Sequence, residues 1–397
     1  GLPADEYVFV VRQDPTDPRL MFVGTKSSVF ASFDGGEHWQ PLALNLPKVQ
    51  VRDLAIDPRQ SALVAATHGR SFWVLDNLAL LEQMTRTAPP ATGATVYAPA
   101  TAWLSHAYGH NPYAKYLHDA GANPPFGATV FYRLPADYDG KTPVTLRVLD
   151  SRGQVVRSFT LHLKVPAPKP AATLRDNWTP LEAKRAAREK LTAAAPGMNR
   201  LQWNLRYPDA TEVTGFQAPI AAGGLDDTVQ GPTVLPGRYR VLLDYGGRTS
   251  TADFTVALDP RLHPAPGALA ANLALGLKIH SALDTLDRTL NRAIGLRSRL
   301  GAAIRGGTLD KARARTVIGA LSHDIDRLVA LQIKSSEGSL LHETKLRSHL
   351  AYLAADIGLS YDRPTSADYA VFAHLLHHAQ TGERRLQADI ARGETML

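Results

Sequence analysis

The sequence predicts a multidomain chain that is mainly β, with an all-α part at its C-terminal end. A stretch of β-type sequence repeats after about 43 residues, which is the length of one four-stranded β-propeller blade. Short apolar strands with tight turns follow, and beyond residue 260 the apolar residues recur at helical spacing. We therefore predict a partial β-propeller over 1–85, an immunoglobulin- or fibronectin-like β-sandwich over 95–262, and an antiparallel four-helix bundle over 266–397.

The repeat comprises residues 8–25 and 51–67, and it places Asp14-Pro15 over Asp57-Pro58. Each unit has the pattern strand, Asp-Pro turn, strand, tight turn and strand. Only about two such blades are present, whereas a propeller closes with roughly four to eight. We expect the chain to be the C-terminal portion of a larger protein.

The first repeat contains the turn SFDGGEHW at 32–39, which has the Ser-x-Asp-x-Gly-x-x-Trp pattern called an Asp-box. The carboxylate of Asp34 can accept hydrogen bonds from nearby backbone N–H groups, and Gly36 allows backbone angles closed to other residues. Trp39 can fill the gap between the hairpin and its neighbour. Together with Ser32, these residues indicate a folding device rather than a catalytic one.

The second repeat ends with an apolar strand at 72–75, and His68-Gly69-Arg70 occupies the turn before it. In a propeller turn, His68 and Arg70 can face the central channel, where ligands bind, or can pair with a neighbouring blade. We carry both residues as candidate ligand-binding groups. No catalytic residue can be assigned from the sequence.

A linker at 85–94 precedes a segment rich in His and Tyr at 103–128. Imidazole and carboxylate groups suit zinc, but their spacing here matches no compact ligand pattern, so we predict no metal site. The residues considered were His106, His110, His118 and Asp119.

The β-sandwich is predicted from strands within 127–165, a strand at 199–207 and a hairpin at 237–260. Helix formers at 181–194 indicate a helical insertion between these strands. Asp226-Asp227 lies in a glycine-rich loop, where adjacent acids can bind a cation or simply form a solvated turn; the turn is the simpler interpretation.

Four amphipathic helices are predicted in the last part of the chain, with Gly306-Gly307 ending the first and Thr365 or Ser366 capping the fourth. The apolar pattern of the first helix breaks at His280. The bundle lacks the Glu-x-x-His motif of di-iron proteins. A cluster of His374, His377 and His378 is explained by a polar helix face, so no metal is predicted there either.

Composition excludes several function classes. The chain has no cysteine, which rules out disulfides, thiolate metal sites and thiol nucleophiles. Its net charge of +7 is modest for 397 residues, and no basic run is interleaved with aromatic residues, so we expect no nucleic-acid partner. No apolar run is long enough to span a bilayer. Phosphate-loop, dinucleotide and Gly-x-Ser-x-Gly motifs are missing from the sequence, and we expect no cofactor.

Several of these segments, spread over residues 20–260, resemble the C-terminal part of large bacterial proteins with sortilin-like, Asp-box propellers. These are often labelled glycosyl hydrolase or bacterial-neuraminidase-repeat proteins. One departure is His38, where the Asp-box commonly has Thr. The resemblance implies a periplasmic or secreted protein with one or two propellers upstream. Its first partner would be that N-terminal propeller portion, in the same chain or a separate one.

Three functional hypotheses remain open. The chain is part of a binding module that captures a peptide or glycan, part of a sialidase-like glycoside hydrolase, or a purely structural portion held to the rest of its propeller. Sialidases resemble one another in using an arginine cluster, a Tyr nucleophile with a Glu partner, and an Asp acid, drawn from several blades. With most blades missing, we expect this chain alone to be non-catalytic.

Overall fold

The computed structural model describes residues 1–86, 93–105, 126–162, 194–216, 230–333 and 342–397, and it is a mixed β and helical structure. The described residues form two compact units. The first unit holds 1–86, 93–105, 126–162, 194–204 and 236–259, and the second holds 205–216, 230–235, 260–333 and 342–397. The predicted helical insertion at 181–194 lies outside the described residues except for Ala194.

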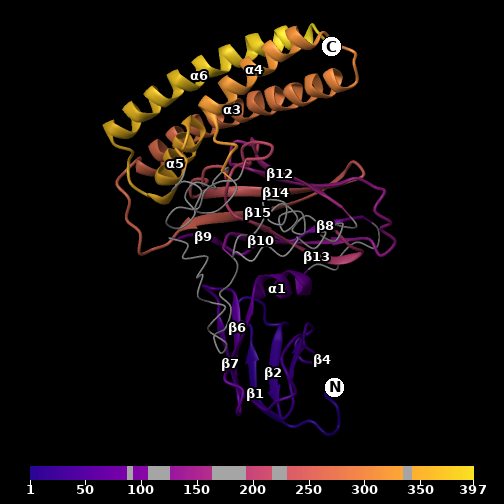
Figure 1. Cartoon of the computed structure of the whole chain (residues 1–397). Coiled ribbons are helices and arrows are strands. Elements are labelled where there is room, and N and C mark those ends of the chain that lie inside the picture. Colours follow the sequence, from indigo (N-terminus) through magenta and orange to yellow (C-terminus); the bar gives the residue numbers. More distant parts are fainter. Residues whose placement is uncertain (87–92, 106–125, 163–193, 217–229, 334–341) are drawn as a thin grey trace. The chain divides into compact units, whose positions relative to one another are not determined.

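The first sheet is a four-stranded antiparallel meander with its strands in chain order (Figure 1). Its strands are β1 (Val8–Gln13), β2 (Met21–Thr25), β3 (Val29–Ser32) and β4 (Gln40–Pro41). Asp14 shapes the turn between β1 and β2, because its Oδ1 accepts hydrogen bonds from the N–H groups of Thr16 and Asp17 at 2.8 and 2.9 Å. Such a bond from side chain to backbone stabilises the reversal of the chain.

The second sheet is a three-stranded antiparallel meander of β5 (Val51–Asp57), β6 (Ala62–Thr67) and β7 (Phe72–Asp76). Its first turn repeats the chemistry of the first sheet. Oδ1 of Asp57 accepts hydrogen bonds from the N–H groups of Arg59 and Gln60 at 2.9 and 3.3 Å. The two strand pairs expected from the alignment of the two Asp-Pro turns are therefore both present.

The first two sheets pack against each other through one apolar core. Strands β1 and β2 both contact β5. The buried members of this core are Val10, Leu20, Phe22, Val29, Ala31, Val51, Leu54, Leu63, Ala65 and Leu78. Burying this surface removes it from water and is the main stabilisation that either sheet receives on this face.

After β7 the chain does not add a fourth strand. It turns at Asn77, whose φ of 62° is left-handed, and continues as helix α1 (Leu78–Arg86). The hydroxyl of Thr85 donates a 2.7 Å hydrogen bond to Asp17, and Nε of Arg86 lies 3.3 Å from the same carboxylate. These bonds fix the end of α1 to the β1–β2 turn.

Two more sheets complete the first unit. One has the order β13-β10-β8, and the other has the order β12-β11-β14-β15-β9. Their strands are β8 (Thr95–Val96), β9 (Ala102–Leu104), β10 (Ala128–Leu134), β11 (Val144–Leu149), β12 (Val155–Leu161), β13 (Gly197–Trp203), β14 (Gly237–Tyr245) and β15 (Arg248–Leu258). Along β10, buried and half-buried residues alternate, as expected for a strand with one face in a core.

An aromatic cluster joins these two sheets. Trp203 of β13 lies 5.8 Å from Tyr239 of β14 and 6.2 Å from Phe254 of β15, measured between ring centroids. The predicted strand at 199–207 is shorter at its end than expected. It stops at Trp203, because Leu205 adopts a left-handed φ of 57° that cannot continue a strand.

The second unit contains four helices that pack together: α3 (Ala268–Arg305), α4 (Lys311–Leu328), α5 (Leu346–Leu359) and α6 (Ser366–Glu394). Helix α3 contacts the other three, and α6 also contacts α4 and α5. The predicted cap is present at Thr365, which exchanges hydrogen bonds with Asp368 in a capping box. The first helix is predicted as continuous up to Gly306-Gly307, and α3 runs without interruption through His280, where the apolar pattern breaks. None of the described helices is both long and apolar enough to cross a membrane.

The four-helix core includes a buried ion pair. Nη2 of Arg347 on α5 lies 3.1 Å from Oδ2 of Asp287 on α3, and both side chains are almost fully buried. The ring of Phe216 stacks on the guanidinium at 4.6 Å. Burial raises the pKa of Asp287 to about 6, although the charge and hydrogen bonds of Arg347 act in the opposite direction.

We predict that the helical part loses stability as the pH rises from 4 to 6. A carboxyl group with a raised pKa binds its proton more tightly in the folded chain, so its stabilising effect is present below about pH 4 and is lost through about pH 6. The expected loss is roughly 2–3 kcal/mol, measured as the urea dependence of helical circular dichroism. Asp287→Asn should remove this pH dependence, and parallel profiles for the two proteins would contradict the assignment.

A pair of glycine substitutions tests the packing of the helices. A Cβ atom at Gly393 would lie 2.8 Å from Leu296, 3.2 Å from Leu300 and 3.2 Å from Val317, whereas one at Gly319 would meet nothing within 4 Å. We expect Gly393→Ala to destabilise the helices by about 1–3 kcal/mol through overpacking. Gly319→Ala should stabilise them by about 0.5–1 kcal/mol, because alanine loses less entropy in a helix. The free energy of unfolding of both variants is measured by helical circular dichroism in urea. Equal changes in the two variants would contradict this packing.

Candidate functional site

The turn at 32–39 is built around Ser32 and Asp34. The buried hydroxyl of Ser32 donates a 2.7 Å hydrogen bond to Oδ1 of Asp34 and accepts one of 2.8 Å from the N–H of Gly36. Oδ1 of Asp34 also accepts a 2.9 Å bond from the N–H of His38. This last bond, with those from Ser32 and the His38 ring, holds the pKa of the Asp34 carboxyl well below its usual range.

Gly36 and Trp39 complete the turn. Gly36 has a φ of 101°, which favours glycine, and a Cβ atom there would lie 3.6 Å from the Trp39 ring. Asp34, Glu37 and His38 bring three ligand atoms within 4.8 Å of one another, but all three residues are exposed. Because Asp34 already bonds to the backbone and to the His38 ring at 2.7 Å, we assign this cluster to the turn.

His68 and Arg70 lie in the exposed turn between β6 and β7. The backbone holds them in place: the N–H of His68 donates to Gln50 at 2.9 Å, and the indole N–H of Trp73 donates to the carbonyl of Arg70 at 3.0 Å. His68 therefore directly follows β6, and Arg70 lies two residues before β7. Their role in ligand binding stays a prediction.

The other residues considered as metal ligands do not form a described site. His106, His110, His118, Asp119, Asp226 and Asp227 all lie outside the described residues. His374, His377 and His378 are exposed on α6, and the rings of His374 and His378 are 4.5 Å apart. Within the described ranges, the only group of three that brings its ligand atoms together is the one in the turn at 32–39.

The outer edge of β7 is a feature that the sequence did not reveal. In the part of the chain that the structure describes, β7 pairs only with β6. Thr67 and Ser71 are hydrogen-bonded across the turn at 3.1 Å, and opposite residues of an antiparallel pair alternate between bonded and non-bonded. Phe72, Val74 and Asp76 then fall in non-bonded positions, so their backbone groups point toward the open edge.

The side chains along this edge are apolar and exposed. Phe72 is 73% exposed and Val74 is 58% exposed. The register places Val64 beside Val74 and Ala66 beside Phe72 on the same face. Trp73 and Leu75 point to the other face, toward the core that the first two sheets share. An open backbone edge with apolar side chains is a surface that most folded proteins cover.

An apolar pocket of about 60 Å³ adjoins the edge. It lies between β7 and the segment that follows β4, where Leu44 has a left-handed φ of 47° and is 73% exposed. Its lining residues are Val29, Leu42, Ala43, Leu44, Asn45, Leu46, Leu63, Ala65, Trp73, Val74 and Leu75. A pocket of this size has room for one small apolar side chain. We define the β7 edge as residues 72–76 with this pocket.

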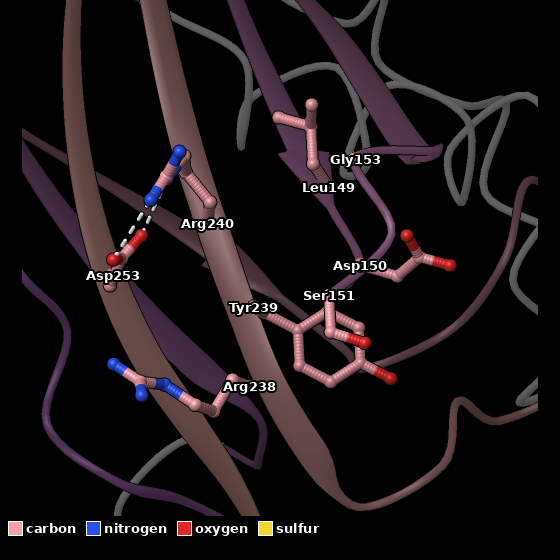
Figure 2. A pocket seen from close by; sticks show the side chains of 8 residues that line it. All are labelled: Leu149, Asp150, Ser151, Gly153, Arg238, Tyr239, Arg240 and Asp253. Carbon is pink, nitrogen blue, oxygen red and sulfur yellow. Dashed lines mark hydrogen bonds and ion pairs between the residues drawn. The ribbon is translucent and has the colours of Figure 1, made fainter.

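A larger and more polar pocket, of about 380 Å³, lies where the β11–β12 turn meets β14 and β15. Figure 2 shows Arg240 and Asp253 pointing toward each other, with hydrogen bonds of 2.6 and 3.0 Å. The other lining residues are Leu149, Asp150, Ser151, Gly153, Arg238 and Tyr239. We call this the polar cleft.

The carboxylates of the polar cleft have structural tasks. Arg240 lowers the pKa of Asp253, and a carboxylate that holds its proton weakly is a poor general acid. Oδ1 of Asp150 accepts hydrogen bonds from the N–H groups of Arg152 and Gln154, both at 2.9 Å, and so shapes the β11–β12 turn. The cleft presents guanidinium and hydroxyl groups that suit the binding of a hydroxylated or anionic ligand.

Comparison with known proteins identifies no family. No family model matches the chain, and no curated protein matches it. One solved structure to which it is similar is the extracellular domain of a hybrid two-component system from B. thetaiotaomicron. That similarity has 10% sequence identity and a TM-score of 0.17, and it covers 66% of this chain and 27% of that one.

Ser32→Ala should loosen the turn at 32–39. The substitution removes two hydrogen bonds of a fully buried hydroxyl and leaves the N–H of Gly36 without that acceptor. We expect the local opening free energy to fall by about 1–2 kcal/mol. Hydrogen exchange at the amides of Gly36 and His38 measures this change. Ser151→Ala, in an exposed turn of the same unit, is the control, and unchanged exchange in Ser32→Ala would contradict the role of Ser32.

Proposed function

We propose that this chain is the non-catalytic C-terminal portion of an exported Asp-box propeller protein that binds a peptide or glycan. Two consecutive meanders with equivalent turns at Asp14 and Asp57 support reading them as propeller blades. The further layout in this proposal is an immunoglobulin-like sandwich and a four-helix bundle. The protein would act in the periplasm or outside the cell, beside its N-terminal propeller portion.

The observation that carries the binding role is the β7 edge. It combines outward-facing backbone groups, exposed Phe72 and Val74, and an apolar pocket. Recognition of extended peptides by strand addition uses these three features, because main-chain hydrogen bonds supply affinity and pockets select side chains.

A sialidase-like hydrolase is the second candidate, and the polar cleft is what favours it. Arg238 and Arg240 lie on one face of β14, and arginines can hold the carboxylate of an acidic sugar. However, Arg240 already forms a bidentate pair with Asp253. The cleft therefore supports glycan binding better than glycan cleavage.

A combined screen tests the proposal. The purified chain is applied to peptide and glycan arrays and is assayed with fluorogenic glycosides, including a sialoside. We expect retention of peptides or glycans without turnover. Val74→Asp at the β7 edge and Arg238→Ala at the polar cleft then locate the surface responsible.

Each outcome of the screen decides between the candidates. Turnover of a fluorogenic glycoside would support the hydrolase and contradict a non-catalytic role. If the screen finds no binding and no turnover, both candidates are overturned and the purely structural hypothesis is left. If binding is unchanged in both Val74→Asp and Arg238→Ala, the ligand binds at neither the β7 edge nor the polar cleft.

A further inference from the structure

We infer that the β7 edge binds an extended peptide as an added antiparallel strand, with an apolar side chain over the pocket and an acidic residue beside Arg70. This inference rests on the proposed binding function and specifies its ligand class, its site and the direction of the bound strand. It follows from backbone geometry, side-chain placement and charge, taken in turn.

The backbone of β7 can pair with an added strand. Residues 72, 74 and 76 direct their N–H and C=O groups away from β6, because they occupy the non-bonded positions of that pair. A peptide lying along β7 can therefore form a regular ladder over five residues without disturbing the second sheet. The first sheet has a fourth strand, β4, beside β3, so an added strand would give both sheets the same number.

The side chains along β7 indicate which residues an added strand would carry. Residues of an added strand alternate between the two faces of the sheet. Those opposite Phe72 and Val74 would cover exposed apolar surface, and those opposite Trp73 and Leu75 would lie over the pocket beside Leu44. A ligand with small apolar or β-branched residues at alternate positions fits this surface.

The charged residues at the two ends of β7 favour one direction for the added strand. Arg70 is exposed just before β7, and Asp76 is the last residue of β7. An antiparallel strand brings its C-terminal end to Arg70 and its N-terminal end to Asp76. An acidic residue or a free carboxylate at the C-terminal end would therefore pair with Arg70, whereas a parallel strand would place it beside Asp76.

The edge of the first sheet that β1 forms provides a control. Strand β1 is also an edge strand with exposed apolar residues, and Val11 is 47% exposed. The pairing of β1 with β2 follows the same alternation. The N–H of Asp14 donates to the carbonyl of Leu20 at 2.9 Å, which puts Val11 in a non-bonded position. The β1 edge does not line the apolar pocket.

The test uses the peptide acetyl-Lys-Val-Thr-Val-Thr-Gly-Asp and the full chain, with titration calorimetry and hydrogen exchange as readouts. We expect saturable binding and slower exchange at the amides of 72–76. Val74→Pro should abolish binding, because it removes an outward N–H and leaves the β6 pairing intact. Val11→Pro should bind the peptide normally. Circular dichroism confirms that both variants are folded.

A charge exchange tests the direction of the strand. Arg70→Glu should weaken binding of the Asp-ending peptide by about tenfold. A peptide amide ending in Lys should bind Arg70→Glu better than it binds the original protein. If both peptides bind both proteins equally, an antiparallel strand with its acidic end at Arg70 is overturned.

The remaining outcomes separate this inference from the proposed function. Peptide binding with exchange protection at 149–153 and 238–253 would overturn the β7 edge and leave the binding function intact. If the chain does not bind this peptide but still retains other ligands on the arrays, the β7 edge is likewise overturned and the binding function is left intact. Concentration-dependent dimerisation that Val74→Pro abolishes would assign the edge to a second copy of the chain and overturn a peptide ligand.

Discussion

The close packing of the first two sheets is the contact on which the N-terminal part of the structure depends. Gly24 on β2 lies at a close contact, because a Cβ atom there would lie 2.7 Å from Val10 and 2.8 Å from the carbonyl of Val51. Each sheet buries its apolar face against the other, which removes that face from water. That arrangement leaves the opposite face of the second sheet, with Phe72 and Val74, uncovered by the described residues.

Local patterns in the sequence predicted local structure well. The paired Asp-Pro turns, the turn at 32–39 and the four C-terminal helices each depend on residues close together in the chain, and each is present. The β7 edge could not be predicted in this way. It exists because the chain leaves the sheet as α1 after Asn77 and because the register exposes one face, and both are properties of the assembled sheet.

Contacts between distant residues were equally hidden. Asp287 and Arg347 are separated by 60 positions, and neither stands out among the charged residues of an amphipathic helix. The sequence pattern predicts a strand through Leu205, but its left-handed backbone ends the strand before it. His68 and Arg70 were singled out for their turn, but what the structure adds is that this turn leads into the open strand β7.

The buried Asp287–Arg347 pair also restricts how this chain can change over evolutionary time. Replacing both residues by apolar ones of similar size is often harmless in proteins, but replacing one leaves a buried charge without its partner, at a cost of about 3–5 kcal/mol. Phe216 adds to this dependence, because its ring lies over the guanidinium. The two codons are therefore expected to change together or not at all, and related chains should carry either both charges or neither.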